Sequence, residues 1–182
     1  MGTGNIIIHT LGPTGTNCEL AAKHWLSISN RLDGVINLHT TLEEAAEKAC
    51  QECDLDSYLL SCVVYPDLHK IVFNNLHCLS LVDCFIMPTY DMVYALRPGI
   101  SNPKIAISHP APVLLIPKDV PQTEFTTSNS MAAVICAQGG ADACITTLPA
   151  AAKYGLQVII NYGPIPMGYC LHKRITKKEL IF

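Results

Sequence analysis

Residues 6–22 read IIIHTLGPTGTNCELAA, and this segment sets the architecture that we predict for the whole chain. It begins as a continuous apolar run, which is typical of a strand buried on both faces. A Gly/Pro turn follows, and Thr16 and Glu19 have the spacing of a capping box, so a helix is expected to start there. The turn is rich in small polar residues, and strand-to-helix corners with such residues often bind an anion. The segment therefore predicts an α/β fold with a candidate site at its first corner.

The same alternation continues along the chain. A second capping box, Thr41 to Glu44, predicts another helix start, and glycines at 139, 140 and 155 predict helix ends. We expect further strands at 34–40, 57–66, 77–96, 104–110, 122–125, 141–147, 156–162 and 166–174, and helices near 41–50, 67–73, 111–119, 130–140, 148–155 and 176–182. Strands that alternate with helices indicate an α/β protein with largely parallel sheets.

Composition narrows the class of protein. The chain has 182 residues, of which 49% are hydrophobic and 15% charged, and these fractions are typical of a well-buried globular protein. A net charge of −3 without a basic stripe argues against a nucleic-acid partner. No apolar run is long enough for a membrane span, and the opening MGTGNIIIHT lacks the basic region of a signal peptide. We therefore expect a cytoplasmic protein without a membrane partner.

Nine cysteines are spread over strand-like and helix-like segments. In a reducing compartment most of them are expected to be small core residues. Cys50 and Cys53 form a CxxC pair, but no second Cys/His pair stands at zinc spacing, so we interpret them as a chance pair on one helix. We predict no metal and no organic cofactor.

Three polar corners stand out, each after a strand and before a helix: GPTGTNC, ISHPAP and FTTSNSM. Hydroxyls and free backbone amides at such corners suit a carboxylate or a phosphate. Ordinary helix capping explains any one corner equally well, whereas three in one small chain favour a site. Nucleotide binding is disfavoured because neither GxxxxGK[ST] nor GxGxxG is present.

The order of these corners resembles the prephenate dehydratase family. LGPTGTNCELAA is similar to the family's GPxGT(F)S turn, ISHPAP to its SHPQ segment, TTSNSMAAVI to its S-T-A-x-A-A helix start and ADACITTLPAAAKYGLQVI to its YGL block. The resemblance covers nearly the whole chain. It implies two α/β lobes like those of periplasmic binding proteins, with a cleft between them: residues 1–84 plus 162–182, and residues 85–161, with no C-terminal regulatory domain. It also implies prephenate, a dianion, as substrate, and a homodimer.

Departures from the dehydratase pattern bear on the reaction. Dehydratases carry Thr-Arg-Phe where this chain has GPIPMGYCLH, and their Pro-Ile-Glu-Asn-Ser segment is replaced by VYPDLHK. These changes resemble the non-aromatising prephenate decarboxylases of bacilysin-type and aeruginosin-type natural-product (antibiotic) biosynthesis. The resemblance implies a lyase that removes carbon dioxide and gives a dihydro-4-hydroxyphenylpyruvate. Two alternatives stay open: a dehydratase that gives phenylpyruvate, and a non-catalytic protein that binds a small anion.

Candidate residues follow from this resemblance. A decarboxylase that keeps the ring hydroxyl must supply a proton to a ring carbon, and the candidates for that role are Cys18, Tyr65, Asp67 and His109. The sequence does not single out one of them, and desolvation of the ring carboxylate is an alternative that needs none. Predicted substrate contacts lie at the three corners and on the last strand: Thr10, Gly12, Thr16, Asn17, Ser108, Thr127, Ser128, Asn129, Met167 and Gly168. The last two are expected to form an apolar wall against the ring.

Overall fold

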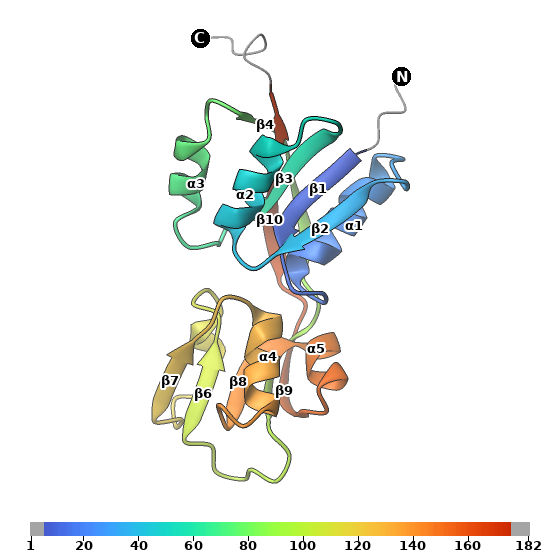
Figure 1. Cartoon of the computed structure of the whole chain (residues 1–182). Coiled ribbons are helices and arrows are strands. Elements are labelled where there is room, and N and C mark those ends of the chain that lie inside the picture. Colours follow the sequence, from blue (N-terminus) through green and yellow to red (C-terminus); the bar gives the residue numbers. More distant parts are fainter. Residues whose placement is uncertain (1–5, 176–182) are drawn as a thin grey trace. The chain divides into compact units, whose positions relative to one another are not determined.

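The structure is a computed structural model that describes residues 6–175. The helix predicted for residues 176–182 lies outside the described residues. Within them the chain divides into two compact units (Figure 1). The first unit contains residues 6–12, 18–87 and 167–175, and the second contains residues 13–17 and 88–166.

The first unit is built on a five-stranded sheet in the order β2-β1-β3-β10-β4. Its strands are β1 (Ile6–Leu11), β2 (Val35–His39), β3 (Asp56–Cys62), β4 (Leu79–Pro88) and β10 (Pro166–Arg174). The strand β1 is parallel to both β2 and β3, while β10 runs antiparallel to β3. The apolar run of β1 is buried along its whole length, as the sequence predicts.

Helices cover both faces of this first sheet (Figure 1). Helix α1 (Asn17–Ile28) packs its alanines on the face that carries Ile6, Ile8 and Leu60. On the opposite face, α2 (Leu42–Gln51) and α3 (Leu68–Asn74) enclose a second cluster around Leu59. The predicted capping box at α2 forms in part. The Thr41 hydroxyl accepts the Glu44 amide at 3.2 Å, while the Glu44 carboxylate accepts the amide of Thr40 at 3.1 Å.

The second unit has a sheet of its own, in the order β7-β6-β8-β5-β9. Its strands are β5 (Met92–Leu96), β6 (Ile105–Ser108), β7 (Gln122–Phe125), β8 (Ala143–Thr147) and β9 (Gln157–Gly163). Strands β7, β6 and β8 are parallel, and β5 is antiparallel to β8 and β9. Helices α4 (Asn129–Ala137) and α5 (Leu148–Lys153) share one buried cluster with this sheet, and the short helix η1 (Val113–Leu115) lies in the segment between β6 and β7.

Both sheets are mixed, which corrects the expectation of largely parallel ones. In each, three strands are parallel, and antiparallel strands stand beside them. Strand–helix alternation links the parallel strands β1, β2 and β3 and the parallel strands β6, β7 and β8. The antiparallel pairs instead join β10 to β3, and β5 to β8 and β9, which are far apart in the chain and not joined by a single crossover helix.

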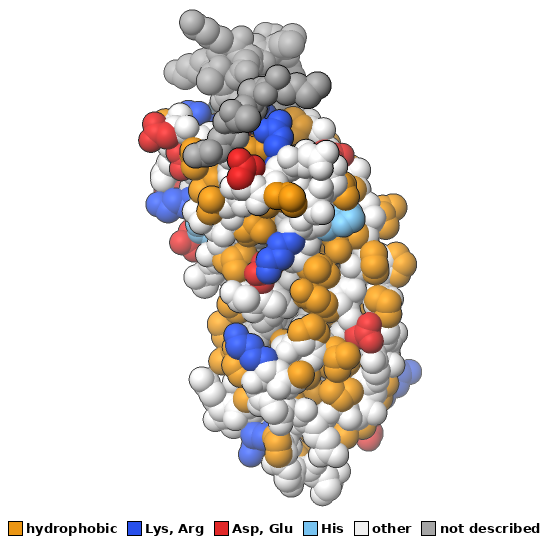
Figure 2. Space-filling model, turned by 90° about the vertical axis from the view of Figure 1, so that its right-hand side faces the viewer, with side chains coloured by type: hydrophobic (Ala, Val, Ile, Leu, Met, Phe, Trp, Pro, Cys, Tyr) orange, Lys and Arg blue, Asp and Glu red, His pale blue; other side chains and the backbone are white. Residues whose placement is uncertain are grey.

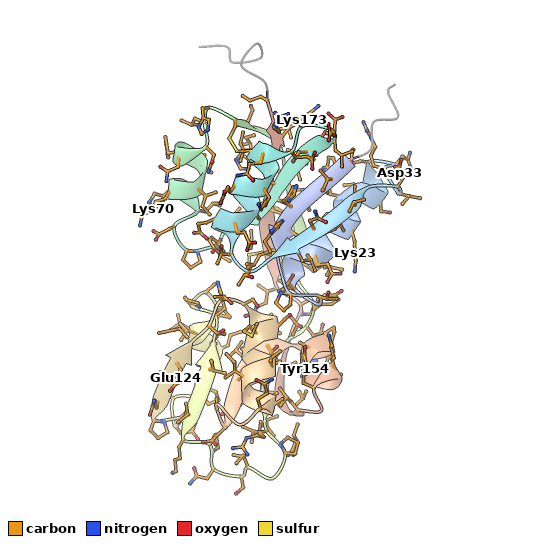
Figure 3. All side chains as sticks on the ribbon, viewed as in Figure 1. Lys23, Asp33, Lys70, Glu124, Tyr154 and Lys173 are labelled. Carbon is orange, nitrogen blue, oxygen red and sulfur yellow. A yellow bond between two sulfur atoms is a disulfide. The ribbon has the colours of Figure 1, made fainter. Side chains whose placement is uncertain are left out.

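A disulfide joins Cys50 and Cys78 (Figure 3), so Cys50 is not a free core thiol, and its partner is not Cys53. Cys53 lies beyond the end of α2 at Gln51, which corrects the placement of both cysteines on one helix. Cys50 lies at the end of α2 and Cys78 just before β4, so the fold brings together residues separated by 28 positions. Cys53 stays a free, exposed thiol. The other six free cysteines are buried, half-buried or, at Cys84, exposed.

None of the helices described between residues 6 and 175 has the length and apolarity needed to cross a membrane. On the face drawn in Figure 2, acidic and basic side chains are scattered singly among hydrophobic and uncharged ones. Figure 3 shows Lys23, Lys70 and Lys173 at separate places on the first unit, where they form no basic stripe.

Candidate functional site

The corner between β7 and α4 holds polar atoms that the fold does not use. Ser128 caps α4 by accepting the amide of Met131 at 3.1 Å, which is an ordinary structural role. The next two residues differ. The Asn129 Oδ1 and Ser130 Oγ atoms are both buried without a hydrogen-bond partner among residues 6–175, and Ser130 as a whole is only 1% exposed. Buried polar atoms normally have partners, so this helix start is a candidate ligand site.

Residues 13–17 belong to the same unit and lie beside this helix start. A Cβ added to Gly15 would stand 3.8 Å from Ser130 Oγ, and its φ of +92° is a conformation that favours glycine. Asn17 fixes the segment, because its Oδ1 accepts the Tyr90 amide at 3.0 Å. Its Nδ2 and that of Asn129 both lie near Met92 Sδ, at 3.8 and 4.0 Å. Two of the three predicted corners thus meet within one unit.

The third corner, after β6, carries Ser108 and His109. Ser108 is fully buried, and its hydroxyl donates to the carbonyl of His109 at 2.8 Å. The His109 Nδ1 accepts the amide of Ala111 at 3.2 Å, so the proton of the neutral ring lies on Nε2. Burial lowers the pKa of His109, which keeps the imidazole neutral at pH 7. His109 therefore presents an N–H donor rather than a positive charge.

Two further predicted contacts differ in exposure. Thr16 is buried, at 4% exposure, whereas Thr127 is exposed.

In the first unit the corresponding polar residues are engaged inside the fold. The Thr10 hydroxyl is fully buried and donates to the carbonyl of Leu60 at 2.8 Å. Gly12 donates its amide to the His39 carbonyl at 2.7 Å, and a Cβ there would come within 3.0 Å of Leu38 Cβ. Glycine at position 12 is thus required by the close approach of two strand ends.

The environment of Cys18 differs from the expectation. A position near a helix N-terminus predicts a lowered thiol pKa, but the pKa of Cys18 is raised to about 12. Burial is the largest cause and the neighbouring Cys62 adds to it, while hydrogen bonds with Thr10 and Cys62 act in the opposite direction. The pKa of Cys18 is therefore raised rather than lowered, and the thiol stays protonated at neutral pH.

Tyr65 and Asp67 lie in the segment between β3 and α3, with opposite protonation states. The Tyr65 hydroxyl donates to Glu43 Oε2 at 2.8 Å and accepts the Leu42 amide at 3.3 Å, and burial raises its pKa to about 12. Asp67 is exposed and adopts a left-handed conformation, with φ +58°. Its hydrogen bond with Lys70, at 2.9 Å, lowers its pKa and keeps it ionised. Of the two, only Tyr65 holds a proton at pH 7.

Met167 and Gly168 lie at the start of β10 and face opposite sides of the sheet, as successive strand residues do. Met167 packs against the cluster that contains Tyr169 and Leu171. A Cβ at Gly168 would meet the Val63 side chain at 3.1 Å, and the Gly168 carbonyl accepts the Val63 amide at 3.1 Å. The two residues therefore do not stand side by side on one wall of the first unit, and their contact with substrate stays a prediction.

One polar cluster is not predicted from the sequence, because no local pattern pairs His9 with His39. The His9 Nδ1 and His39 Nε2 atoms lie 2.9 Å apart, and the rings stack with centroids 5.1 Å apart. The His39 Nδ1 atom in turn lies 3.7 Å from Glu44 Oε1. Burial lowers the pKa of His9 to about 4, with a smaller contribution from His39. His39 lies on β2 opposite Leu11, two residues beyond His9 on β1. Its contact with His9 can therefore be recognised only once the register of the two strands is known.

Ser130 was also missed, although the corner FTTSNSM was recognised. The signal was the pair of serines that flank Asn129, since only the first of them can cap the helix. No group of three or more His, Cys, Asp or Glu side chains in the described part of the chain is arranged to hold a metal ion.

No protein-family model matches the chain. A prephenate decarboxylase of Bacillus subtilis is 32% identical over 179 residues, which cover 91% of this chain and 85% of the relative. A prephenate decarboxylase of Planktothrix agardhii is 27% identical, covering 94% of this chain and 90% of the relative.

Solved structures agree on the fold. Prephenate dehydratase from Arthrobacter aurescens, crystallised with L-Phe, aligns with a TM-score of 0.67 at 18% identity, over 94% of this chain and 61% of that chain. The periplasmic domain of Bordetella pertussis BvgS aligns with a TM-score of 0.56 at 17% identity, over 97% of this chain and 38% of that chain. These alignments confirm the α/β fold, with the dehydratase and a periplasmic domain as relatives in architecture. The identity and coverage of the Bacillus relative show that the chain belongs to the prephenate decarboxylase family.

Proposed function

We propose that the protein removes carbon dioxide from prephenate and keeps the ring hydroxyl. The bond between the ring and its carboxylate breaks, carbon dioxide leaves, and the electron pair shifts through the ring diene. A ring carbon then takes up one proton, which gives a dihydro-4-hydroxyphenylpyruvate. The observation that carries this proposal is membership of the prephenate decarboxylase family.

An apolar residue at position 167 supports a reaction without loss of the hydroxyl, and the protonation states of the candidate donors bear on which of them protonates the ring. Expelling a hydroxyl requires an acid beside it, and Met167 stands where the resemblance places the dehydratase acid. Cys18, Tyr65 and His109 each hold a proton at neutral pH, whereas Asp67 is held ionised by Lys70. The first three therefore remain candidates to protonate the ring, and Asp67 is the weakest of the four.

The helix start of α4 is the place where we propose that one substrate carboxylate binds. Ser130 Oγ is a donor without a partner among the described residues, and Asn17 and Asn129 bring amide nitrogens to the same unit. The positive end of a helix favours an anion over a neutral group. Ser108, His109, Thr16 and Thr127 stay candidate contacts in this unit, and Gly12, Met167 and Gly168 in the other. Ser128 and Thr10 are the weakest of the predicted contacts, because their hydroxyls already bond to the Met131 amide and the Leu60 carbonyl.

One incubation tests the reaction. The protein is mixed with prephenate at neutral pH, and the products are followed by absorbance and identified by mass. We expect a product that has lost carbon dioxide and kept its hydroxyl oxygen. Accumulation of phenylpyruvate would instead identify a dehydratase, and binding without turnover would identify a small-anion binding protein. The variant Ser130→Ala, which lacks the proposed carboxylate donor, should slow formation of the same product without changing its identity.

We also propose the setting of this reaction: a cytoplasmic homodimer that serves natural-product (antibiotic) biosynthesis. Free thiols at seven of the cysteines support a reducing compartment, and the Cys50–Cys78 disulfide argues in the other direction. The strand β4 lies at the edge of its sheet with Leu81, Val82 and Ile86 exposed by 55, 50 and 79%, which supports association. Cell fractionation and sedimentation of the purified protein test these two statements, and a purely monomeric species would refute the second.

A further inference from the structure

Two free cysteines lie next to each other on neighbouring strands of the first unit. Cys84 is on β4 and Cys170 is on β10, and these two strands are adjacent in the sheet. Their sulfur atoms are 3.7 Å apart. The neighbours of both residues along their strands, Phe85 on β4 and Tyr169 on β10, pack into the cluster beneath α1. Both thiols therefore point to the opposite face, because strand side chains alternate.

From this geometry we propose that Cys84 and Cys170 are a redox-active pair that forms a second disulfide by exchange with a low-molecular-weight disulfide. A disulfide needs its sulfurs about 2.05 Å apart, and rotation of the two cysteine side chains can supply the difference from the observed separation. The site goes beyond the proposed reaction and does not depend on it.

Access decides the order of the two steps. Cys84 is exposed, so its thiolate attacks the small disulfide RSSR first, releases RS⁻ and becomes a mixed disulfide. The thiolate of the half-buried Cys170 then attacks the Cys84 sulfur and releases the second RS⁻. In sum, two protein thiols and RSSR give one protein disulfide and two RSH, so the electrons balance. Burial and the neighbouring Cys84 raise the pKa of Cys170 to about 11, which makes the second step faster as pH rises.

The other thiols of the chain lack this combination of a partner and access. Cys136 and Cys144 interact with each other but are fully buried. Cys18 has Cys62 as its neighbour and is only 7% exposed. Cys53 is exposed, and its described contacts are with the Gln51 carbonyl, at 3.3 Å, and with Arg174, at 3.6 Å, rather than with a second free thiol. Cys53 is therefore a matched control, because it is exposed like Cys84 and has no resolving partner.

The position of the pair gives its oxidation a structural consequence. The chain leaves the first unit at the end of β4, enters the second unit at Pro88 and returns after Pro166, at the start of β10. A bond between Cys84 and Cys170 would therefore fasten together the two strands through which the chain passes between its units. Only the segment 13–17 of the second unit lies outside the loop that this bond closes.

The test is oxidation of the full chain by excess glutathione disulfide, followed by peptide mapping without reduction. We expect a cross-link between peptides that contain Cys84 and Cys170, with loss of two hydrogens, and a lasting glutathione adduct at Cys53. In Cys170→Ser the adduct should instead persist at Cys84. In Cys53→Ser the cross-link should form as in the parent chain.

Two results would overturn the proposal. One is a parent chain in which Cys84 keeps its glutathione adduct, or stays unmodified, while Cys53 reacts. The other is a cross-link of Cys84 to a cysteine other than Cys170. Circular dichroism of each serine variant shows that it is folded, and the mapped bond itself is a readout that does not depend on enzyme activity.

Discussion

The two units build strand-to-helix corners from similar residues, yet they use the polar side chains differently. In the first unit the Thr10 hydroxyl donates to Leu60, and Tyr65 bridges Glu43 and Leu42. In the second unit Ser128 satisfies the helix start, while Asn129 Oδ1 and Ser130 Oγ have no partner among the described residues. A buried polar atom without a partner costs about 1–3 kcal/mol. The first unit has such atoms too, on His9, Tyr169 and His172, but these residues lie within strands, whereas Asn129 and Ser130 lie at a helix start that favours an anion.

This contrast separates capping from binding within one short segment. Ser128 and Ser130 are the same residue type, two positions apart, and both are buried. One makes the hydrogen bond that a helix requires, and the other does not. A polar corner in a sequence thus contains both residues that cap the helix and residues that are free to bind a ligand. Only their hydrogen-bond partners in the structure distinguish the two.

Ser130→Ala is expected to have the largest effect. If Ser130 Oγ donates to a substrate carboxylate, its loss removes a hydrogen bond to a charged group, worth about 1.5–3 kcal/mol. We therefore expect kcat/KM for prephenate to fall by roughly 10–100-fold. Steady-state kinetics with prephenate measures this, and chemical denaturation should show a folded state at least as stable as that of the parent.

Ser128→Ala is the matched control. It removes the cap of α4 and should lower the free energy of unfolding by about 1 kcal/mol, with a change in kcat/KM of less than two-fold. The comparison between the units fails if the two variants exchange their effects, so that Ser128→Ala impairs catalysis and Ser130→Ala impairs only stability.

The buried histidine pair of the first unit makes stability depend on pH. The pKa of His9 falls from 6.5 to about 4 on folding, so the unfolded chain binds more protons between these two values. Stability from the neutral ring is complete above pH 6.5 and is lost as pH falls towards 4. His39, Glu52 and Lys48 are the charged or titratable groups that act on this ring besides burial.

His9→Gln should therefore flatten the acid side of the stability profile. Glutamine cannot take up a proton, so the loss of unfolding free energy between pH 7.5 and pH 5 should shrink by about 1–2 kcal/mol. Urea titrations at the two pH values measure this. His109 and His172, whose pKa values burial also lowers, are unchanged in both proteins and cancel in the difference. An equal pH dependence in parent and variant would show that His9 does not titrate in this window.

Much of the fold could be predicted from the sequence because its signals are local. Each of these signals depends on residues that are close together in the sequence. Examples are the apolar run of β1, the Thr41–Glu44 box and Gly155 after α5. The mixed sheets could not be predicted in this way. The antiparallel strands β5 and β10 pair with strands that are distant in the sequence, and no local signal marks those partners.

The site was predicted less well because its details depend on tertiary contacts. The Cys50–Cys78 bond and the His9–His39 pair join segments 28 and 30 residues apart, and no spacing rule marks them. The raised pKa of Cys18 reflects burial that the helix position alone does not reveal. The three corners themselves were visible because hydroxyl and amide residues follow strands, which is a local pattern.

Thr10→Val tests the other side of the contrast between the units. The sequence predicts that Thr10 contacts the substrate, whereas its hydroxyl is buried and bonded to the Leu60 carbonyl. Valine has a similar shape and removes only the hydroxyl, so the free energy of unfolding should fall by about 1 kcal/mol. We expect kcat/KM to change by less than two-fold. A large loss of kcat/KM with unchanged stability would restore Thr10 as a substrate contact.

Asp67→Asn should have the smallest effect of the series. Asp67 is exposed, and its ion pair with Lys70 is of the surface kind that contributes little to stability. The Lys70 hydrogen bond lowers the pKa of Asp67, so the carboxylate carries no proton to give at neutral pH. We expect kcat to change by less than about two-fold at pH 7, and the thermal midpoint by no more than about 2 °C. A much larger loss of kcat would mean that Asp67 acts as the sequence predicts, by supplying a proton to the ring, and its ion pair with Lys70 would then have to open during the reaction.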